Sequence, residues 1–325
     1  MQRRMFITLL SGAAIAWPLA ARAQQPERVR RIGVLMALDP DDPEGQSEVK
    51  GLKQGLQELG WIEGRNLQME YSWPGGEPNR IQASAKALVG AQCDVIVARS
   101  TPVVAALLRE THTIPIVFGW VVDPVGSGFV QSFPHPGGNV TGFQNLEFSM
   151  VGKWIELLVR IAPSVRRVVY IYNLATVPTG FLRTLDALAP TIPVKLVAAP
   201  VHNSAEIDAA VAEFAREPGG GLMMMPDTFN EANHVQIIAL AAKCGLPAVY
   251  PHRFNDGLIS YGPDLPSLFK RAASYVDRIL RGEKPAELPV QAPTSYELII
   301  NLKTAKALGL TVPQSLVVAA DEVID

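Results

Sequence analysis

The chain has 325 residues, of which 48% are hydrophobic and 18% are charged, a composition typical of globular proteins and long enough for two domains. Its formal net charge is −2, but residues 1–23 hold three arginines and no acid, which leaves 26 Lys and Arg against 31 Asp and Glu in the remainder. An acidic remainder without a basic run excludes nucleic acids and anionic membranes as expected partners.

The first 23 residues have the pattern of an export signal. A basic start, MQRRMF, precedes the apolar stretch FITLLSGAAIAWPLA, and ARA before Gln24 fits a small-x-small cleavage site. The apolar stretch has about 15 residues, whereas a membrane-spanning helix needs about 20. Arg3 and Arg4 also fit the twin-arginine export route, so the route stays open. We expect a periplasmic chain, cleaved after Ala23 and without a lipid anchor.

From residue 30 the chain alternates short apolar runs with amphipathic segments. Strands are predicted at 30–38, 66–73, 94–98 and 114–120, and helices at 44–60, 77–90 and 102–111. The first helix, for example, carries Val49, Leu52 and Leu56 on one face. A passage at 132–146, rich in Gly, Pro and Asn, then interrupts the alternation and is expected to contain turns.

A second series of the same kind follows. Helices are predicted at 149–163, 180–190, 205–217 and 231–245, and strands at 166–173, 194–200, 220–226 and 247–250. The remaining chain reads as a strand at 258–262, a helix at 264–285, an extended stretch at 288–301 and a short helix at 302–310. Strands joined by crossover helices require parallel pairing with right-handed connections.

These two series predict the α/β class, with two doubly wound parallel-sheet lobes. The C-terminal part is too small for a core of its own, so we expect a hinge that the chain crosses at 137–146, 251–262 and 284–292. Lobe 1 would hold residues 27–143 plus 260–284, and lobe 2 would hold residues 144–259 plus 285–325.

Cysteines and histidines give no sign of a metal or cofactor. Cys93 and Cys244 are expected in different lobes, too far apart for a disulfide. The five histidines have no metal-ligand spacing and are expected on the surface or in loops; they are His112, His135, His202, His234 and His252. We therefore expect no cofactor and no metal.

Ligands of open α/β sheets bind at the carboxyl ends of the strands, so the loops there hold the candidate contacts. Two facing sets of such loops would form a clamp. The candidates in lobe 1 are Asp39, Ser100, Thr101, Trp120 and Asp123, and those in lobe 2 are Asn173, Asp227, Phe229, Arg253 and Phe254. For Trp120, stacking on a ligand and filling the core stay open. Asp123 would either pair with a ligand cation or cap a helix after Pro124.

Ser100 and Thr101 stand where a buried strand gives way to a helix. A serine nucleophile needs a base and an oxyanion hole, but the G-x-S-x-G pattern is absent and the nearest histidine, His252, stands alone. We therefore expect no catalysis. Free N–H groups and the helix dipole favour a bound carboxylate at this corner. The alternative is that the two hydroxyls only cap the helix.

Six segments together carry a family resemblance: GLKQGLQELGWIEGRNLQMEY, STPVVAAL, IPIVFGWVVDPVGSGFV, HPGGNVTGF, RILRGEKPAELPVQAPTSYELIINLKTAKALGLTVP and ADEVI. With them the chain resembles the ABC transporter substrate-binding proteins of the tryptophan/tyrosine-type periplasmic family. The resemblance implies a type I periplasmic-binding fold with a three-stranded hinge. It also implies a monomer that captures a small solute and delivers it to a permease and ATPase of the inner membrane.

The resemblance also implies roles for particular residues. Ser100 and Thr101 would hold a ligand carboxylate, and Asp123, Asn173 and Asp227 would line the cleft. After NVTG, amino-acid-binding members are expected to place an acid that meets an α-ammonium group.

This chain has Gln144 and Asn145 there instead. Neutral amides do not offset a buried cation as a carboxylate does. An aromatic or other organic acid is therefore an alternative to an aromatic amino acid as the ligand.

Two other functions stay open at this point. One is a periplasmic sensor that presents its closed form to a membrane receptor, because its sequence would look the same. The other is a periplasmic enzyme on a doubly wound fold. The isolated position of His252 and the absence of the G-x-S-x-G nucleophile pattern argue against it.

Overall fold

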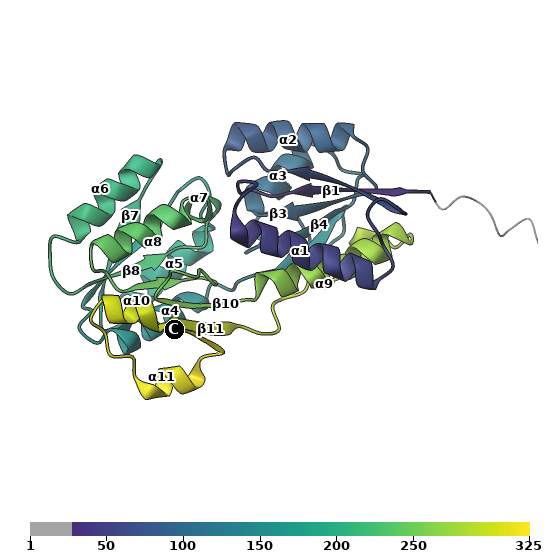
Figure 1. Ribbon diagram of the computed structural model, residues 1–325. Coiled ribbons are helices and arrows are strands. Elements are labelled where there is room, and N and C mark those ends of the chain that lie inside the picture. Colours follow the sequence, from purple (N-terminus) through teal and green to yellow (C-terminus); the bar gives the residue numbers. More distant parts are fainter. Residues whose placement is uncertain (1–27) are drawn as a thin grey trace, which may run out of the picture.

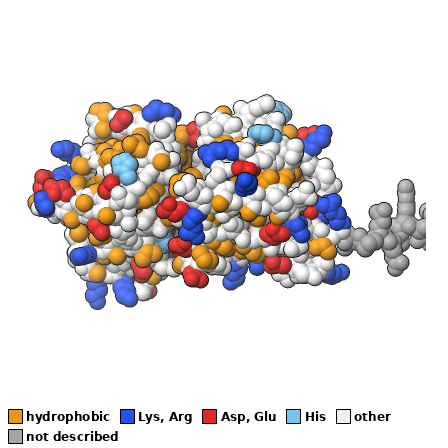
Figure 2. Space-filling view, turned by 90° about the horizontal axis from the view of Figure 1, so that it is seen from above, with side chains coloured by type: hydrophobic (Ala, Val, Ile, Leu, Met, Phe, Trp, Pro, Cys, Tyr) orange, Lys and Arg blue, Asp and Glu red, His pale blue; other side chains and the backbone are white. Residues whose placement is uncertain are grey.

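The structure, a computed structural model, describes residues 28–325, which form two α/β lobes side by side (Figure 1). The export signal predicted at 1–23 lies outside the described residues. Among residues 28–325, no helix is both long and apolar enough to cross a bilayer. On the face seen in Figure 2, acidic and basic side chains are interspersed over both lobes. The predicted two-lobed α/β fold is confirmed.

Lobe 1 is built around a parallel sheet with the strand order β2-β1-β3-β4-β5. Its strands are β1 (Arg30–Leu35), β2 (Leu67–Ser72), β3 (Val95–Arg99), β4 (Ile116–Val121) and β5 (Val140–Gln144). Helices α1 (Pro43–Glu58) and α9 (Leu265–Leu280) cover one face, and α2 (Pro78–Gly90) and α3 (Thr101–Glu110) cover the other. Because strand residues alternate between faces, Val97 packs toward α1 and α9 while Ile96 packs toward α2 and α3.

Lobe 2 has a larger sheet with the order β12-β11-β10-β9-β8-β6-β7. Its strands are β6 (Arg167–Tyr172), β7 (Lys195–Pro200), β8 (Gly220–Met224), β9 (Ala248–Tyr250), β10 (Ile259–Gly262), β11 (Glu297–Asn301) and β12 (Glu322–Ile324). Its helices are α4 (Met150–Ile161), α5 (Thr179–Leu188), α6 (Ser204–Phe214), α7 (Thr228–Ala232), α8 (His234–Lys243), α10 (Leu302–Ala307) and α11 (Gln314–Ala319). The helices α4 and α5 pack on one face and α6 and α8 on the other. Only the β10–β11 pair is antiparallel among these strands.

The chain passes between the lobes three times. It leaves lobe 1 after β5, returns between β10 and α9, and leaves again after Gln291. The segment with the short helix η1 (Pro285–Glu287) still belongs to lobe 1, because the Thr141 hydroxyl donates to the Leu288 carbonyl oxygen at 2.6 Å. The backbone N–H of Gln144 likewise donates to the backbone carbonyl oxygen of Gln291 at 2.8 Å.

These pairings shift the lobe boundaries expected at 260 and 284. Strand β10 pairs with β9 and β11 in the sheet of lobe 2, whereas residues 285–291 lie against β5. We propose 28–144 plus 264–291 for lobe 1 and 145–263 plus 292–325 for lobe 2.

Strand β5 lies in the passage that was expected to contain turns and for which no strand was predicted. Gly142 has a φ of 151°, and a Cβ there would lie 2.1 Å from the Phe118 carbonyl oxygen. Only glycine lets β5 approach β4 so closely, and the same glycine makes the sequence look like a turn. The helix predicted at 231–245 is divided at Asn233 into α7 and α8, and α11 was not predicted.

The two cysteines lie in different lobes, as predicted, and neither forms a disulfide. Burial raises the pKa of the Cys93 thiol to about 11. At neutral pH this thiol is therefore a poor nucleophile.

Helices α1 and α9 pack closely because two glycines face the partner backbone. A Cβ on Gly51 would lie 2.2 Å from the Pro266 carbonyl oxygen, and one on Gly55 would lie 2.5 Å from that of Lys270. This contact ties α9, which arrives from lobe 2, to the first helix of lobe 1.

The Gly51→Ala substitution should destabilise the protein by about 2 kcal/mol, because overpacking outweighs the better helix propensity of Ala. Gly152→Ala in α4 is the control, since its Cβ would meet only the Leu188 side chain at 3.7 Å. That variant should gain up to about 1 kcal/mol. Urea unfolding measures both, and equal effects would contradict the close α1–α9 contact.

Candidate functional site

The carboxyl ends of the strands in both lobes converge on the contact between the lobes. From lobe 1, β3 ends at Arg99 and leads through Ser100 into α3. From lobe 2, β8 leads into α7, and His252 follows β9. Helix α7 reaches the opposite lobe, because a Cβ on Gly76 would lie 3.0 Å from the Ala232 Cβ. The lobes are therefore in contact at the crevice where the fold places ligands.

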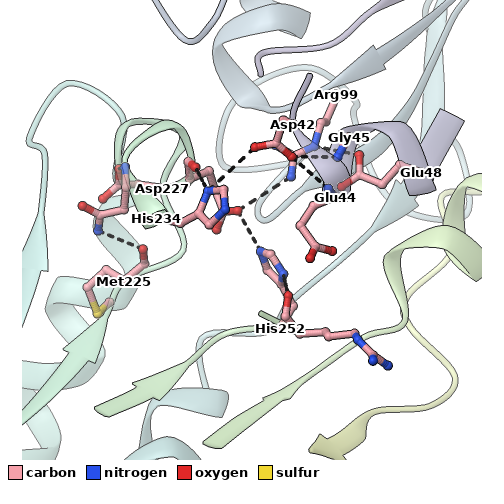
Figure 3. Close-up of polar contacts among 12 residues, drawn as sticks. Asp42, Glu44, Gly45, Glu48, Arg99, Met225, Asp227, His234 and His252 are labelled. Carbon is pink, nitrogen blue, oxygen red and sulfur yellow. Dashed lines mark hydrogen bonds and ion pairs between the residues drawn. The ribbon is translucent and has the colours of Figure 1, made fainter. Parts of the chain in front are cut away.

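Four buried titratable side chains meet at this contact, and we call Glu48, Arg99, Glu231 and His252 the interlobe cluster. Figure 3 labels Glu48, Arg99 and His252. None is more than 2% exposed. In lobe 1, Nε of Arg99 donates to Oε2 of Glu48 at 2.7 Å. In lobe 2, Nε2 of His252 lies 2.8 Å from Oε2 of Glu231. The two pairs meet where Nη2 of Arg99 lies 3.7 Å from Oε2 of Glu231.

Burial opposes the charged form of each group, so the partners decide which protonation states persist. Burial lowers the pKa of His252, but the Glu231 carboxylate outweighs it and the pKa lies above its ordinary value. Burial raises the pKa of Glu231, yet His252 and Arg99 bring that pKa below its ordinary value. Both pKa shifts act in the direction that favours a Glu231 carboxylate beside a His252 imidazolium. The pKa of Glu48 is raised by burial, against the opposing Arg99.

Aromatic rings and a second pair surround the cluster. Nδ1 of His234 lies 3.8 Å from Oδ2 of Asp42, across the lobe contact (Figure 3). The Phe254 ring lies 4.8 Å from the His234 ring and 4.4 Å from the His252 ring. Both histidines are buried; His252 lies in a loop, as expected, but the surface or loop placement expected for His234 was wrong, because it begins α8. Within residues 28–325, no group of three or more His, Cys, Asp or Glu residues is arranged to hold a metal.

Several buried polar atoms at this contact have no hydrogen-bond partner. In residues 28–325 they are Oε1 of Glu48, Nη1 and Nη2 of Arg99, Oγ of Ser100, Nε1 of Trp120, both amide atoms of Asn145, Oδ1 of Asn230 and Oε1 of Glu231. Such groups are rare in folded proteins, and each costs about 1–3 kcal/mol. All nine atoms belong to residues at the facing ends of the lobes, an arrangement suited to a polar ligand.

Ser100 has a backbone conformation that normally requires glycine. Its φ is 90° and its ψ is 153°, and its side chain makes no cap hydrogen bond to α3. A non-glycine residue in this region stores about 1–3 kcal/mol of strain and is typical of functional sites. The structure thus does not support the reading of Ser100 as a helix cap. Thr101, the first residue of α3, lines a cavity of about 450 Å³ that Ala175 and Val177 of lobe 2 also line.

The two amides after NVTG differ in their surroundings. Nε2 of Gln144 donates to the carbonyl oxygens of Val122 at 2.6 Å and Leu146 at 2.8 Å. Gln144 therefore braces the hinge and has no free donor for a ligand. Asn145 is fully buried and both of its amide atoms lack a partner. Of the two, Asn145 is the stronger ligand candidate.

The remaining candidates of lobe 1 have structural contacts. The Arg99 guanidinium carbon lies 4.8 Å from the centre of the Trp120 ring, which otherwise fills the core. Oδ1 of Asp123 accepts from the Gly126 N–H at 2.8 Å, so it caps a turn rather than the expected helix. Asp39 is exposed and lies beside Gly75.

In lobe 2, Asp227 is the N-cap of α7. It accepts from the Asn230 N–H at 2.9 Å and from the Thr176 hydroxyl at 3.0 Å. Asn173 belongs to the same network, because its N–H donates to Asp227 and its Oδ1 accepts from the Ala175 N–H. These bonds stay within one lobe, so Asp227 and Asn173 shape the loop.

The last two candidates of lobe 2 point elsewhere. Phe229 is half-buried and packs against the core under α6 and α8. Arg253 forms an ion pair with Glu322 and lines a cavity of about 370 Å³ near the second crossing.

Sequence reasoning missed Glu48, Arg99 and Glu231, although two of them left a signal. Glu48 lies four residues before Leu52 and three after Gly45, within the buried stripe of α1. Arg99 shares a strand face with Val97, which faces α1. An acid and a base in these two positions predict a buried pair. Glu231 lies on a helix too short to show a periodic pattern.

Asp227 should make stability depend on pH. Burial raises the pKa of its carboxyl to about 7, whereas an unfolded Asp titrates near pH 4. Between these values the folded chain binds more protons than the unfolded chain, so stability falls as pH rises. In the Asp227→Asn variant the asparagine side chain would still cap α7. Between about pH 4 and 7.5, the free energy of unfolding of the wild type should fall by roughly 3 kcal/mol relative to that of the Asp227→Asn variant.

Urea unfolding of both proteins at several pH values measures this difference. The two proteins should differ least near pH 4, which serves as the internal control. A difference that stays constant across the range would contradict the raised pKa of Asp227.

Comparisons with known proteins agree with this architecture. The model of a family described as ABC transporter substrate binding protein matches residues 31–324. A curated relative, the "Tyrosine-binding protein" of Clostridioides difficile (strain R20291), is 26% identical over 293 residues, which cover 87% of this chain and 82% of that protein.

Two solved structures have the same fold. A conserved domain protein from Vibrio cholerae O1 biovar El Tor is 30% identical with a TM-score of 0.81, covering 91% of this chain and 100% of that chain. An ABC domain in complex with L-Trp from Streptococcus pneumoniae is 24% identical with a TM-score of 0.80. The match covers 91% of this chain and 99% of that chain. Because the family model spans nearly all of the described residues, the chain belongs to the family of ABC transporter substrate-binding proteins.

Proposed function

We propose that the chain is the exported, periplasmic solute-binding component of an ABC uptake transporter and clamps a small carboxylate-bearing solute between its lobes. The observation that carries this proposal is the set of buried, unpartnered polar atoms at the facing ends of both lobes. A ligand that contacts both sets stabilises the closed form relative to the open form. The permease and ATPase of the inner membrane then receive the solute from the closed monomer.

The corner at β3 and α3 is the proposed carboxylate site. The free N–H groups at the start of α3 and the positive end of its dipole favour an anion. The unpartnered Ser100 hydroxyl and the two Nη atoms of Arg99 are further donors at the same strand end. Arginine pairs with carboxylates in a bidentate geometry.

The rest of the solute would occupy the space between the lobes. The cavity beside Thr101 has a volume of about 450 Å³ and includes Ile81, Val177 and Pro178 among its lining residues, within the usual size range of small-ligand sites. One relative is named as a tyrosine-binding protein, and the solved structure of another is a complex with L-Trp. An aromatic amino acid or an aromatic or other organic acid is therefore the proposed ligand. The family is one of solute-binding proteins, and no catalytic step is proposed.

A solute panel tests this function. The purified exported chain should be stabilised by at least one member of a panel of the twenty amino acids, aromatic acids and dicarboxylic acids. A ligand present at a hundred times its Kd adds about 2.7 kcal/mol, which thermal melting detects readily, and calorimetry then gives the affinity. If no member of the panel stabilises the chain, the proposed function is wrong.

The Ser100→Gly substitution should stabilise the free protein and lower its affinity for the ligand. Glycine relieves the backbone strain at a φ of 90° but loses more conformational entropy on folding. The net gain in the free energy of unfolding should be about 1 kcal/mol. Loss of the hydroxyl should lower affinity about 10-fold for the best panel solute.

Gln92→Gly is the matched control, because Gln92 also has a positive φ, at 53°, but lies at the opposite end of β3. It should gain stability with unchanged affinity. Unchanged affinity in Ser100→Gly would remove Ser100 from the ligand site.

A further inference from the structure

Two cavities that the proposed solute site does not use adjoin each other at the lobe contact. One has a volume of about 470 Å³ and lies between α8, α10 and the start of α1. The other has a volume of about 370 Å³ and lies between the start of α1, the second crossing and the strands β11 and β12. Pro43, Glu44 and Asn255 line both cavities. The two cavities therefore form one groove, which we call the junction groove.

The junction groove crosses from one lobe to the other. Glu44 extends from α1 of lobe 1 toward the loop of lobe 2 that holds His252 (Figure 3). Beside it, Nδ1 of His234 at the start of α8 lies 3.8 Å from Oδ2 of Asp42, the N-cap of α1. A rotation that opens the lobes would carry the start of α1 away from α8 and would divide the groove. The complete groove therefore belongs to the closed form.

One end of the junction groove is an open apolar side of α8. Ile237 of this helix faces the core of lobe 2. Another side of the helix lines the groove with Val235, Ile238, Ala239 and Ala242. Val235 is 69% exposed. A helix with apolar residues on more than one side is typical of a helix that is covered on each of them, so this end of the groove fits apolar side chains of a partner.

The other end of the junction groove has an excess of negative charge. Its basic side chains already have partners, since Arg253 pairs with Glu322 and His252 pairs with Glu231. Three further carboxylates line this end, and within residues 28–325 none of them forms an ion pair: Glu44, Asp264 and Glu297. A basic group is therefore the complement that this end lacks.

The titration of two of these acids agrees with the excess of charge. Burial and the neighbouring Asp264 carboxylate raise the pKa of Glu297, against the opposing Arg253. Burial also raises the pKa of Glu44. Both carboxylates are thus harder to ionise than an isolated glutamate, and a basic group beside them would favour their charged forms.

We propose that the junction groove docks a periplasmic segment of the permease that carries apolar side chains and a neighbouring lysine or arginine. This inference rests on the proposed function and specifies the face of the chain that the transporter contacts. The apolar side chains lie against α8, and the basic side chain enters the acidic end.

The shape and charge of the groove favour this occupant over the others. From Val235 to Ala242 the apolar side of α8 is about 10 Å long, which is room for a few side chains. The acidic end repels a carboxylate-bearing solute and an anionic membrane surface. Because both lobes line the groove, a segment that fills it binds the closed form more tightly than the open form. Docking at this face thus distinguishes a loaded chain from an empty one.

Stimulation of the transporter's ATPase tests this docking face. The cognate permease and ATPase are reconstituted in proteoliposomes, and the exported chain is added with the panel solute that raises its melting temperature most. Val235→Asp and Glu297→Lys should each raise the chain concentration for half-maximal stimulation at least about 10-fold. The first substitution buries a charge among apolar groups, and the second repels the basic side chain. Solute affinity, measured by calorimetry, should stay unchanged in both variants.

Val318→Asp on α11 and Glu213→Lys on α6 are the matched controls. The Val318 residue is 76% exposed and the Glu213 side chain 68%, and neither lines the groove. Both controls should stimulate the ATPase as the wild type does. Thermal melting identifies variants that are folded. A folded Val235→Asp or Glu297→Lys variant that stimulates as the wild type does would overturn the proposal.

Ionic strength gives a second readout that a merely structural role would not change. The half-maximal concentration of the wild type should rise with added salt, because salt screens the attraction between the acidic end and the basic side chain. In Glu297→Lys this rise should be smaller. An equal salt dependence in the two proteins would overturn the role of the acidic end.

The same experiments separate the docking face from the proposed function. Wild-type stimulation that all four variants share would overturn the docking face and leave the function standing. A wild type that binds a solute but does not stimulate the ATPase would overturn the uptake role, and the docking face with it. Sedimentation tests a second copy of the chain as the occupant. A wild-type dimer that Val235→Asp dissociates would assign the groove to that copy and overturn the proposal.

Discussion

Three chain crossings hold the carboxyl ends of two parallel sheets face to face. The second crossing matters most, because it returns the chain to lobe 1 as α9, and α9 packs on Gly51 and Gly55 of α1. Neither lobe can leave the other, but three short connections permit rotation. Loops that would be independent in a single sheet therefore become two halves of one site. The position of every candidate ligand contact follows from this arrangement.

The charges of the interlobe cluster are paired mainly within each lobe. Glu48 pairs with Arg99 inside lobe 1, and Glu231 pairs with His252 inside lobe 2. Separation of the lobes would break the longer contact between Arg99 and Glu231, at 3.7 Å, and would leave Arg99 and Glu231 each with a partner in its own lobe. At the closed contact, nine buried polar atoms within residues 28–325 have no hydrogen-bond partner, which lowers stability unless a ligand pairs them. Under the proposed function, a ligand that pairs these atoms would couple closure to binding.

The sequence predicted the alternation of strands and helices well because each lobe is doubly wound and each element has a regular apolar face. The strand β5 was missed because Gly142, which makes its close pairing with β4 possible, is also the signal of a turn. The second hinge crossing was displaced by a few residues because no sequence pattern distinguishes an extended crossing from a short strand. Strand β10 therefore could not be assigned to its sheet before pairing was seen.

The candidate site was predictable only in part, and the reason is physical. The loops after the strands, including Ser100 and Asn145, follow from the topology of parallel sheets. The interlobe cluster depends on contacts between positions far apart in the chain, such as Arg99 on β3 and Glu231 on α7. Several of the predicted polar residues instead satisfy their own loops, as Asp227 does by capping α7. Residue type and position at a strand end do not reveal whether a side chain faces the ligand or the backbone.

Local rules of sequence and structure fail together at one place in this molecule. Ser100 stands where glycine is favoured, Glu48 interrupts the apolar stripe of α1, and Arg99 ends a buried strand. Each residue lowers stability relative to a simpler choice, since strain and burial of charge both cost free energy. Departures that served only packing would be scattered through the two lobes. Their meeting at the lobe contact, beside unpaired donors and acceptors, indicates that stability is given up there for recognition.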